Sequence, residues 1–163
     1  MGRKHVAAHN SDKVDPVRLM VAAHELGHAA VWSATGMRVE LIEVTGHGLR
    51  TQGTVQLANN ARLSSAADCR SYLVGMLAGR EAEDRWCTVT GTRPVADGCA
   101  DDRRAFGYMY RRRRPWGVTE TRAELRAQAR QLVRQHWPTI ARLAPRLARR
   151  GSLPTTALPT APT

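Results

Sequence analysis

Long apolar runs and paired cysteines are both missing from this 163-residue chain. No segment approaches the roughly 18 consecutive apolar residues of a transmembrane helix, so we expect no membrane span. The N-terminus is basic but has no apolar run behind it, which argues against a secretory signal. The three cysteines, Cys69, Cys87 and Cys99, form no Cys-x-x-Cys pair, which favours reduced thiols over disulfides or a cysteine zinc site. These absences predict a cytoplasmic protein.

Negative charge is scarce in the C-terminal half. Residues 103–150 hold 14 arginines and 2 acidic residues, within a total net charge of +11. Arg122, Arg126, Arg130 and Arg134 recur every four residues, and residues 111–114 are four further arginines just before Trp116. Such clusters could contact nucleic acid, an acidic protein or an anionic membrane surface. A solvated helix face has the same four-residue spacing and is the more common case.

The length suits a single domain with flexible ends. Residues 1–14 are polar and mixed in charge, and we expect a poorly ordered arm there. Residues 151–163 are rich in proline and threonine, which predicts a disordered tail. The folded domain is therefore expected over residues 15–150.

One segment carries a recognisable chemical pattern, the His-Glu-x-x-His of His24, Glu25 and His28. Asp15 followed by a proline predicts a helix start, and Gly36 predicts its end. On that helix the two imidazoles lie one turn apart on the same face, where both can bind one zinc ion. Glu25 can then accept a proton from a water molecule that the ion polarises. A chance pairing on an amphipathic helix is the alternative, but a buried histidine pair without a common partner would be costly.

The remaining pattern predicts a mainly α-helical fold with a small β-hairpin or sheet near the metal helix. Strands are expected at 39–44 and 53–57, and helices at about 65–87, from about 98, and from 119 onward with a break at Trp137-Pro138. The edge of the hairpin could accept an extended peptide. Simple packing on the helices is the more common role for a short hairpin.

Several segments together resemble the peptidase domain of FtsH, the membrane-bound ATP-dependent zinc metalloprotease. Residues 24–29 resemble its HExGHA segment, and residues 39–53 resemble the strand and glycine turn that follow. Residues 77–83 resemble its GGRxAE segment, and residues 98–102 resemble its GASND segment. The resemblance extends over about residues 17–150.

This resemblance implies a zinc metalloendopeptidase in which His24, His28 and Asp102 bind zinc and Glu25 is the catalytic base. Asp101 stands beside Asp102 as a competing carboxylate, and the alignment favours Asp102. Two imidazoles and one carboxylate leave a position open for water and substrate, as a catalytic zinc requires. By the same resemblance Glu83 could orient a ligating imidazole, or it could pair with an arginine of its own helix.

The sequence contains no Gly-x-x-x-x-Gly-Lys-Ser/Thr phosphate loop. We therefore expect either a separate ATPase chain as partner or substrates that are already unfolded or loosely folded. Peptidases of the ImmA and IrrE kind, which cut repressors, share the first motif but not the other segments. A basic module that binds nucleic acid or a protein partner and contains a structural zinc site is the alternative of a different class.

Overall fold

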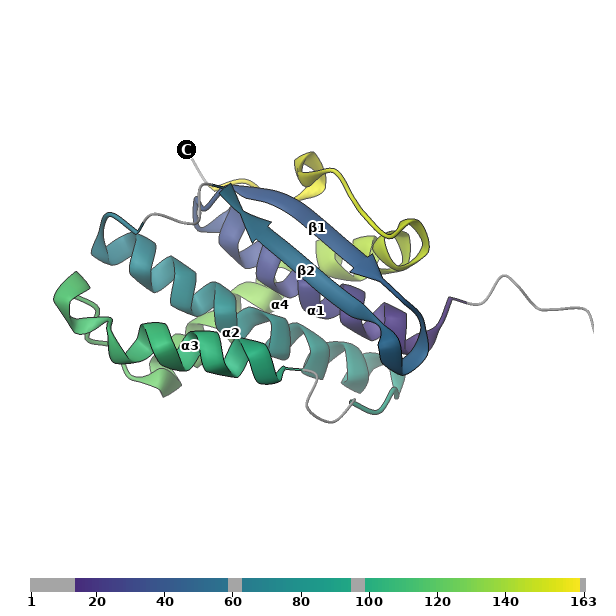
Figure 1. The fold of residues 1–163 in the computed structure, drawn as a ribbon, viewed down its shortest axis with the longest axis horizontal. Coiled ribbons are helices and arrows are strands. Elements are labelled where there is room, and N and C mark those ends of the chain that lie inside the picture. The colour runs from purple at the N-terminus through teal and green to yellow at the C-terminus, as the bar shows by residue number, and fades with distance from the viewer. Residues whose placement is uncertain (1–13, 59–62, 95–98, 162–163) are drawn as a thin grey trace, which may run out of the picture.

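A computed structural model describes residues 14–58, 63–94 and 99–161 (Figure 1). In this part of the chain the fold is mainly helical, as the sequence predicts. The four α-helices are α1 (Pro16–Ala34), α2 (Ala66–Thr90), α3 (Ala100–Arg111) and α4 (Arg122–Arg150). Strands β1 (Val39–Thr45) and β2 (Gln52–Leu57) form a small antiparallel sheet. The predicted N-terminal arm lies outside the described residues except for Val14.

Helix α1 is the centre of the fold. The Asp15 carboxylate accepts a hydrogen bond from the Val17 amide at 2.9 Å, and proline at the first helical position needs no partner for its nitrogen. Residues 22–32 of this helix are all buried. Helices α2 and α4 and both strands pack around it (Figure 1). The histidine motif therefore lies inside the molecule rather than on a solvated face.

The hairpin covers one side of α1. Val39, Ile42 and Val44 of β1 are buried, and Val44 pairs with Gly53 of β2. The other edge of β1 forms an isolated bridge to Ser152. In the described residues β2 pairs only with β1, so the outer edge of β2 has free backbone groups.

Helix α4 runs unbroken through Pro138 and Pro145, so the predicted break at Trp137-Pro138 is wrong. A proline inside a helix costs about 3 kcal/mol. The turns after Pro138 bury Ile140, Leu143 and Leu147 completely, and this apolar burial offsets the cost. Tertiary packing therefore outweighs the local signal of the proline.

The arginine series on α4 is only partly a solvated face. Arg126 and Arg130 both donate to the carboxylate of Glu81 on α2, which is buried. The Arg122 guanidinium lies over the Phe106 ring, 5.1 Å from its centroid. Two members of the series thus join α4 to α2 through one buried acidic side chain.

The predicted disordered tail is also wrong for residues 151–161. Gly151 ends α4 in the left-handed conformation, and the short turn η4 (Thr155–Ala157) follows. Leu153 and Leu158 are buried, and the Ser33 hydroxyl donates to the Pro159 carbonyl at 2.6 Å. The proline and threonine content predicted disorder, but the same segment contains two leucines that pack in the hydrophobic core. In the described part of the chain no helix has the length and apolarity to cross a membrane.

Candidate metal centre

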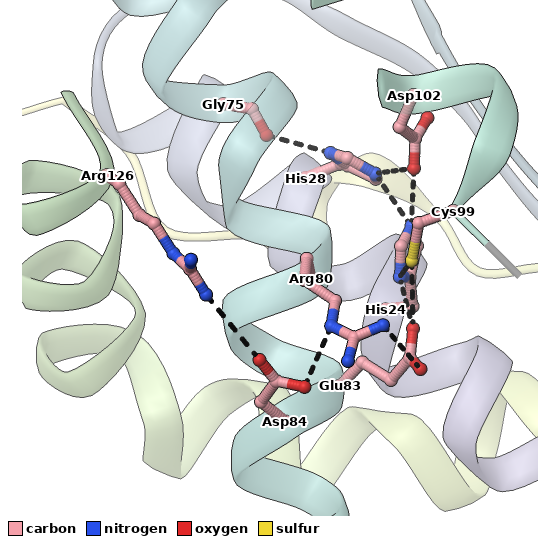
Figure 2. Close-up of polar contacts among 9 residues, drawn as sticks. All are labelled: His24, His28, Gly75, Arg80, Glu83, Asp84, Cys99, Asp102 and Arg126. Atoms are coloured by element: carbon pink, nitrogen blue, oxygen red, sulfur yellow. Dashed lines mark hydrogen bonds and ion pairs between the residues drawn. The ribbon is translucent and has the colours of Figure 1, made fainter. Parts of the chain in front are cut away.

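Three predicted site residues converge on one point. His24 Nε2 and His28 Nε2 are 3.0 Å apart, and Asp102 Oδ2 lies 2.8 Å from the first and 3.2 Å from the second. The imidazoles come from adjacent turns of α1, and the carboxylate comes from the first turn of α3 (Figure 2). A helix–strand–helix path of more than 70 residues thus returns to the histidine motif.

The hydrogen bonds of the other ring nitrogens fix which atoms carry protons. His28 Nδ1 donates to the Gly75 carbonyl at 2.8 Å, and His24 Nδ1 donates to Glu83 Oε2 at 3.0 Å. In the neutral imidazoles both Nε2 atoms therefore present lone pairs toward each other and toward a carboxylate oxygen. Three acceptors around one point form a group that can bind a cation.

The pKa of His24 reflects the acceptor groups that surround this imidazole. Burial lowers the pKa of this imidazole, but hydrogen bonds to Asp102, Cys99 and Glu83 outweigh burial and raise it well above 6.5. Burial likewise opposes ionisation of Asp102, yet hydrogen bonds from His24 and His28 hold its pKa far below the ordinary value. A proton can supply the missing positive charge here, and a divalent ion can do so more fully.

Only one of the two adjacent aspartates reaches the imidazoles. The Asp101 side chain is 93% exposed and pairs with Arg104. The Asp102 side chain is 32% exposed and points at both histidines. The Asp102 carboxylate therefore lies beside both imidazoles, whereas the Asp101 carboxylate does not.

The donor set fits a zinc ion. Ligand atoms bonded at 2.0–2.1 Å around a tetrahedral ion lie about 3.3 Å from one another. The three observed separations of 2.8–3.2 Å are close to that spacing. Two imidazole nitrogens and one carboxylate oxygen also suit zinc, and they leave a fourth position open.

A second group of potential ligands lies on the opposite side of the His24 ring. Cys99 Sγ is 3.2 Å from Glu83 Oε2 and 3.7 Å from His24 Nδ1, and all three residues are buried. Cys99 was not among the residues predicted for this site. Its position three residues before Asp102 was the only available signal. Glu83 and Cys99 contact His24 Nδ1, the ring nitrogen that faces away from His28 and Asp102. They therefore hold the His24 ring in the orientation that points Nε2 at the first group.

Glu83 contacts both an imidazole and an arginine of its own helix, the two alternatives that the sequence suggested. Its Oε2 holds His24, while its Oε1 lies 3.8 Å from Arg80 Nη1. Burial opposes ionisation of Glu83, but the hydrogen bonds from His24 and Cys99 and the positive charges of His24 and Arg80 together outweigh burial and lower its pKa. A chain of ion pairs continues from Arg80 through Asp84 to Arg126 on α4 (Figure 2). The orientation of His24 is thereby linked to the helix packing.

Glycines allow the elements to approach the site this closely. A Cβ on Gly79 would lie 2.2 Å from His28 Nε2, and one on Gly53 would lie 2.3 Å from Glu25 Oε1. A Cβ on Gly75 would lie 2.0 Å from the Trp32 nitrogen. Real Cβ atoms essentially never come so near. Sequence spacing gave no indication of these contacts, because they join residues from different elements.

Glu25 lies where two cavities meet along β2. One cavity of about 430 Å³ extends toward Leu49 and Asp101, and another of about 480 Å³ extends toward Trp32, Tyr72 and Met76. Glu25, Gly53, Thr54 and Asp102 line both, so the two form a continuous cleft beside the histidines. Burial raises the pKa of the Glu25 carboxyl, although His24 and His28 oppose the rise. The cleft places this carboxyl next to space that a substrate can occupy.

Comparison with models of known protein families finds no match to this chain, and comparison with curated proteins finds none either.

Proposed function

We propose that this chain is a zinc-dependent endopeptidase that cleaves unfolded or loosely folded polypeptides. One observation carries the proposal: two imidazole lone pairs and one carboxylate oxygen converge within 3.2 Å beside a buried glutamate in an open cleft. His24, His28 and Asp102 would hold the ion, with Glu83 and the Gly75 carbonyl orienting the two rings. Structural zinc sites use four protein ligands, so three ligands beside a cleft favour a catalytic role.

A bound zinc ion would polarise the substrate carbonyl and lower the pKa of water at the site. Glu25 would accept a proton from the attacking water and then donate it to the leaving amine. The edge of β2 runs along the cleft, and its free backbone groups would hydrogen-bond an extended substrate. Such pairing would hold the peptide bond next to Glu25.

The resemblance to the FtsH peptidase domain supports the same assignment of His24, Glu25, His28 and Asp102. It also agrees with the mainly helical fold and the small sheet beside the metal helix. Under this proposal an ATPase or unfoldase in a separate chain would deliver folded substrates. Polypeptides that are already unfolded would need no such partner.

Cleavage of a fluorescently labelled unfolded protein, measured together with zinc content, tests the proposal. We expect Glu25→Gln to retain zinc and to lose turnover by about a hundredfold to ten-thousandfold, because the amide cannot accept the proton. His28→Gln should lose both zinc and turnover. Glu40→Gln is a matched control, because Glu40 is exposed on β1 away from the cleft.

Three results would contradict different parts of the proposal. Undiminished turnover in Glu25→Gln would refute the role of this carboxyl. Full zinc content in His28→Gln would refute the ligand assignment. Absence of cleavage by the zinc-loaded wild type, with unfolded substrate and no ATPase, would favour a structural zinc site.

A further inference from the structure

The outer face of α3 carries an unusual concentration of positive charge beside the cleft. Arg104, Tyr108, Arg111 and Arg112 recur at the spacing of one helix face, and all four are exposed. We call these four residues the α3 basic face. Residues 103–118 include six arginines and no acidic residue.

Of the three arginines in the α3 basic face, Arg104 alone has an ion pair among the described residues. Arg104 pairs with the exposed Asp101. In residues 14–58, 63–94 and 99–161 no ion pair involves Arg111 or Arg112. The Arg112 guanidinium stacks on the Tyr108 ring, 3.7 Å from its centroid, which keeps the cation ordered without removing its charge. An ordered, unpaired guanidinium such as that of Arg112 binds a carboxylate with a smaller loss of side-chain entropy.

The α3 basic face is continuous with the cleft. Ala105 lines the cavity that contains Glu25 and His28, and it also lines a shallow groove with Arg104, Tyr108 and Arg111. Asp102, one turn earlier on α3, belongs to the metal site itself. A polypeptide that leaves the cleft past Ala105 would therefore pass directly over the basic face.

We propose that the α3 basic face docks an acidic segment of the polypeptide whose peptide bond lies in the cleft. This inference rests on the proposed function and adds a substrate class to it. The path from Asp102 to Arg112 is about 15 Å along the helix, which an extended chain covers in about five residues. The acidic residues of the substrate should thus begin within about five positions of the cleaved bond.

Binding to an inactive enzyme tests this separately from catalysis. Fluorescence anisotropy of zinc-loaded Glu25→Gln would be measured with a labelled unstructured peptide rich in glutamate and with its matched Glu→Gln peptide. We expect tighter binding of the acidic peptide, weakened by added salt. The combined substitution R104Q/R111Q/R112Q should raise its dissociation constant about tenfold, since each exposed pair contributes only modestly.

A triple substitution of equal charge on α4, R142Q/R146Q/R149Q, is the matched control. These three arginines are exposed and lie on another helix. If both triple variants weaken binding of the acidic peptide equally, the proposal is overturned, because only the total charge of the protein would matter. Equal affinity for the two peptides would also overturn it.

Binding of a single-stranded DNA with the same net charge as the acidic peptide tests the alternative that the α3 basic face binds nucleic acid. If the DNA binds more tightly than the acidic peptide and loses affinity in the α3 triple, the face is a nucleic-acid surface and the proposal is wrong. Wild-type cleavage of the glutamine peptide reports on the proposed peptidase function independently. Its absence would refute that function, whatever the anisotropy shows.

Discussion

At the scale of single residues, Gly79 shows how closely α2 approaches the two imidazoles of the candidate metal site. It faces the two imidazoles from α2, and no side chain fits there. We expect Gly79→Ala to displace the rings and to weaken zinc binding by about tenfold to a hundredfold, the range seen when the support of a ligand is lost. Isothermal titration of the metal-free protein with zinc measures this.

Gly107→Ala is the matched control for that experiment. Gly107 also lies inside a helix, but the nearest atom to an added Cβ is a flexible Arg111 nitrogen at 3.4 Å. Zinc affinity should stay unchanged, and the free energy of unfolding should rise by about 0.5–1 kcal/mol. Equal zinc affinity in Gly79→Ala and wild type would show that the close approach of α2 at Gly79 is not needed for zinc binding.

Residues of this site differ in how well sequence could reveal them. His24, Glu25 and His28 lie within one helical turn, so local spacing is sufficient to place them together. Asp102 needed the resemblance to a known family, because no local rule connects α3 to α1. The contact of Glu83 with an imidazole was likewise expected only from the resemblance, and the contact of Cys99 was not expected. Both depend on the packing of three helices, which no periodic pattern in a single sequence encodes.

At the scale of elements, Glu81 joins α2 to α4. Burial opposes its ionisation, but hydrogen bonds from Arg130 and Arg126 outweigh burial and lower its pKa below 4.5. A lowered carboxyl pKa adds stability that is present above the unfolded value and is lost as pH falls through the folded value. We expect Glu81→Gln to be less stable than wild type at pH 7, with the difference shrinking below about pH 4.5.

Urea unfolding of both proteins at several pH values checks this expectation. Glu40→Gln is the control, because Glu40 is exposed on β1 and its loss leaves α2 and α4 unchanged. A difference between wild type and Glu81→Gln that stays constant from pH 7 to strongly acidic conditions would contradict the assignment. Such a result would mean that the amide disturbs packing rather than charge.

Helix α4 also shows where element prediction from sequence fails. The apolar spacing correctly predicts a helix from about residue 119, and α4 begins at Arg122, where Thr121 caps it. Pro138 predicts a break, yet the helix continues because its second half is buried against the core. The strands, the start of α1 and the start of α2 were predictable within about two residues, since local capping and alternation determine them.

At the scale of the whole molecule, the C-terminal segment is part of the fold. Leu153 N donates to the Ile42 carbonyl at 3.4 Å, and Leu153 and Leu158 are each only 7% exposed. We expect removal of residues 152–163 to lower the free energy of unfolding by about 2–4 kcal/mol, because two apolar side chains are lost and β1 becomes exposed. Thermal unfolding measures the loss.

A shorter truncation provides the comparison. A chain that ends at Pro159 keeps both leucines and the carbonyl that binds Ser33. It should melt close to the full chain. Similar melting of all three proteins would show that the segment contributes no stability.

The separation of the proposed metal ligands along the chain has a consequence for synthesis. His24 and Asp102 are 78 positions apart, so the ribosome must complete α2 and begin α3 before all three ligands exist. Until then the two imidazoles can hold an ion only weakly. Under the proposed function, activity would therefore follow the folding of most of the chain, and this order of synthesis would protect the nascent protein from cleavage by its own active site.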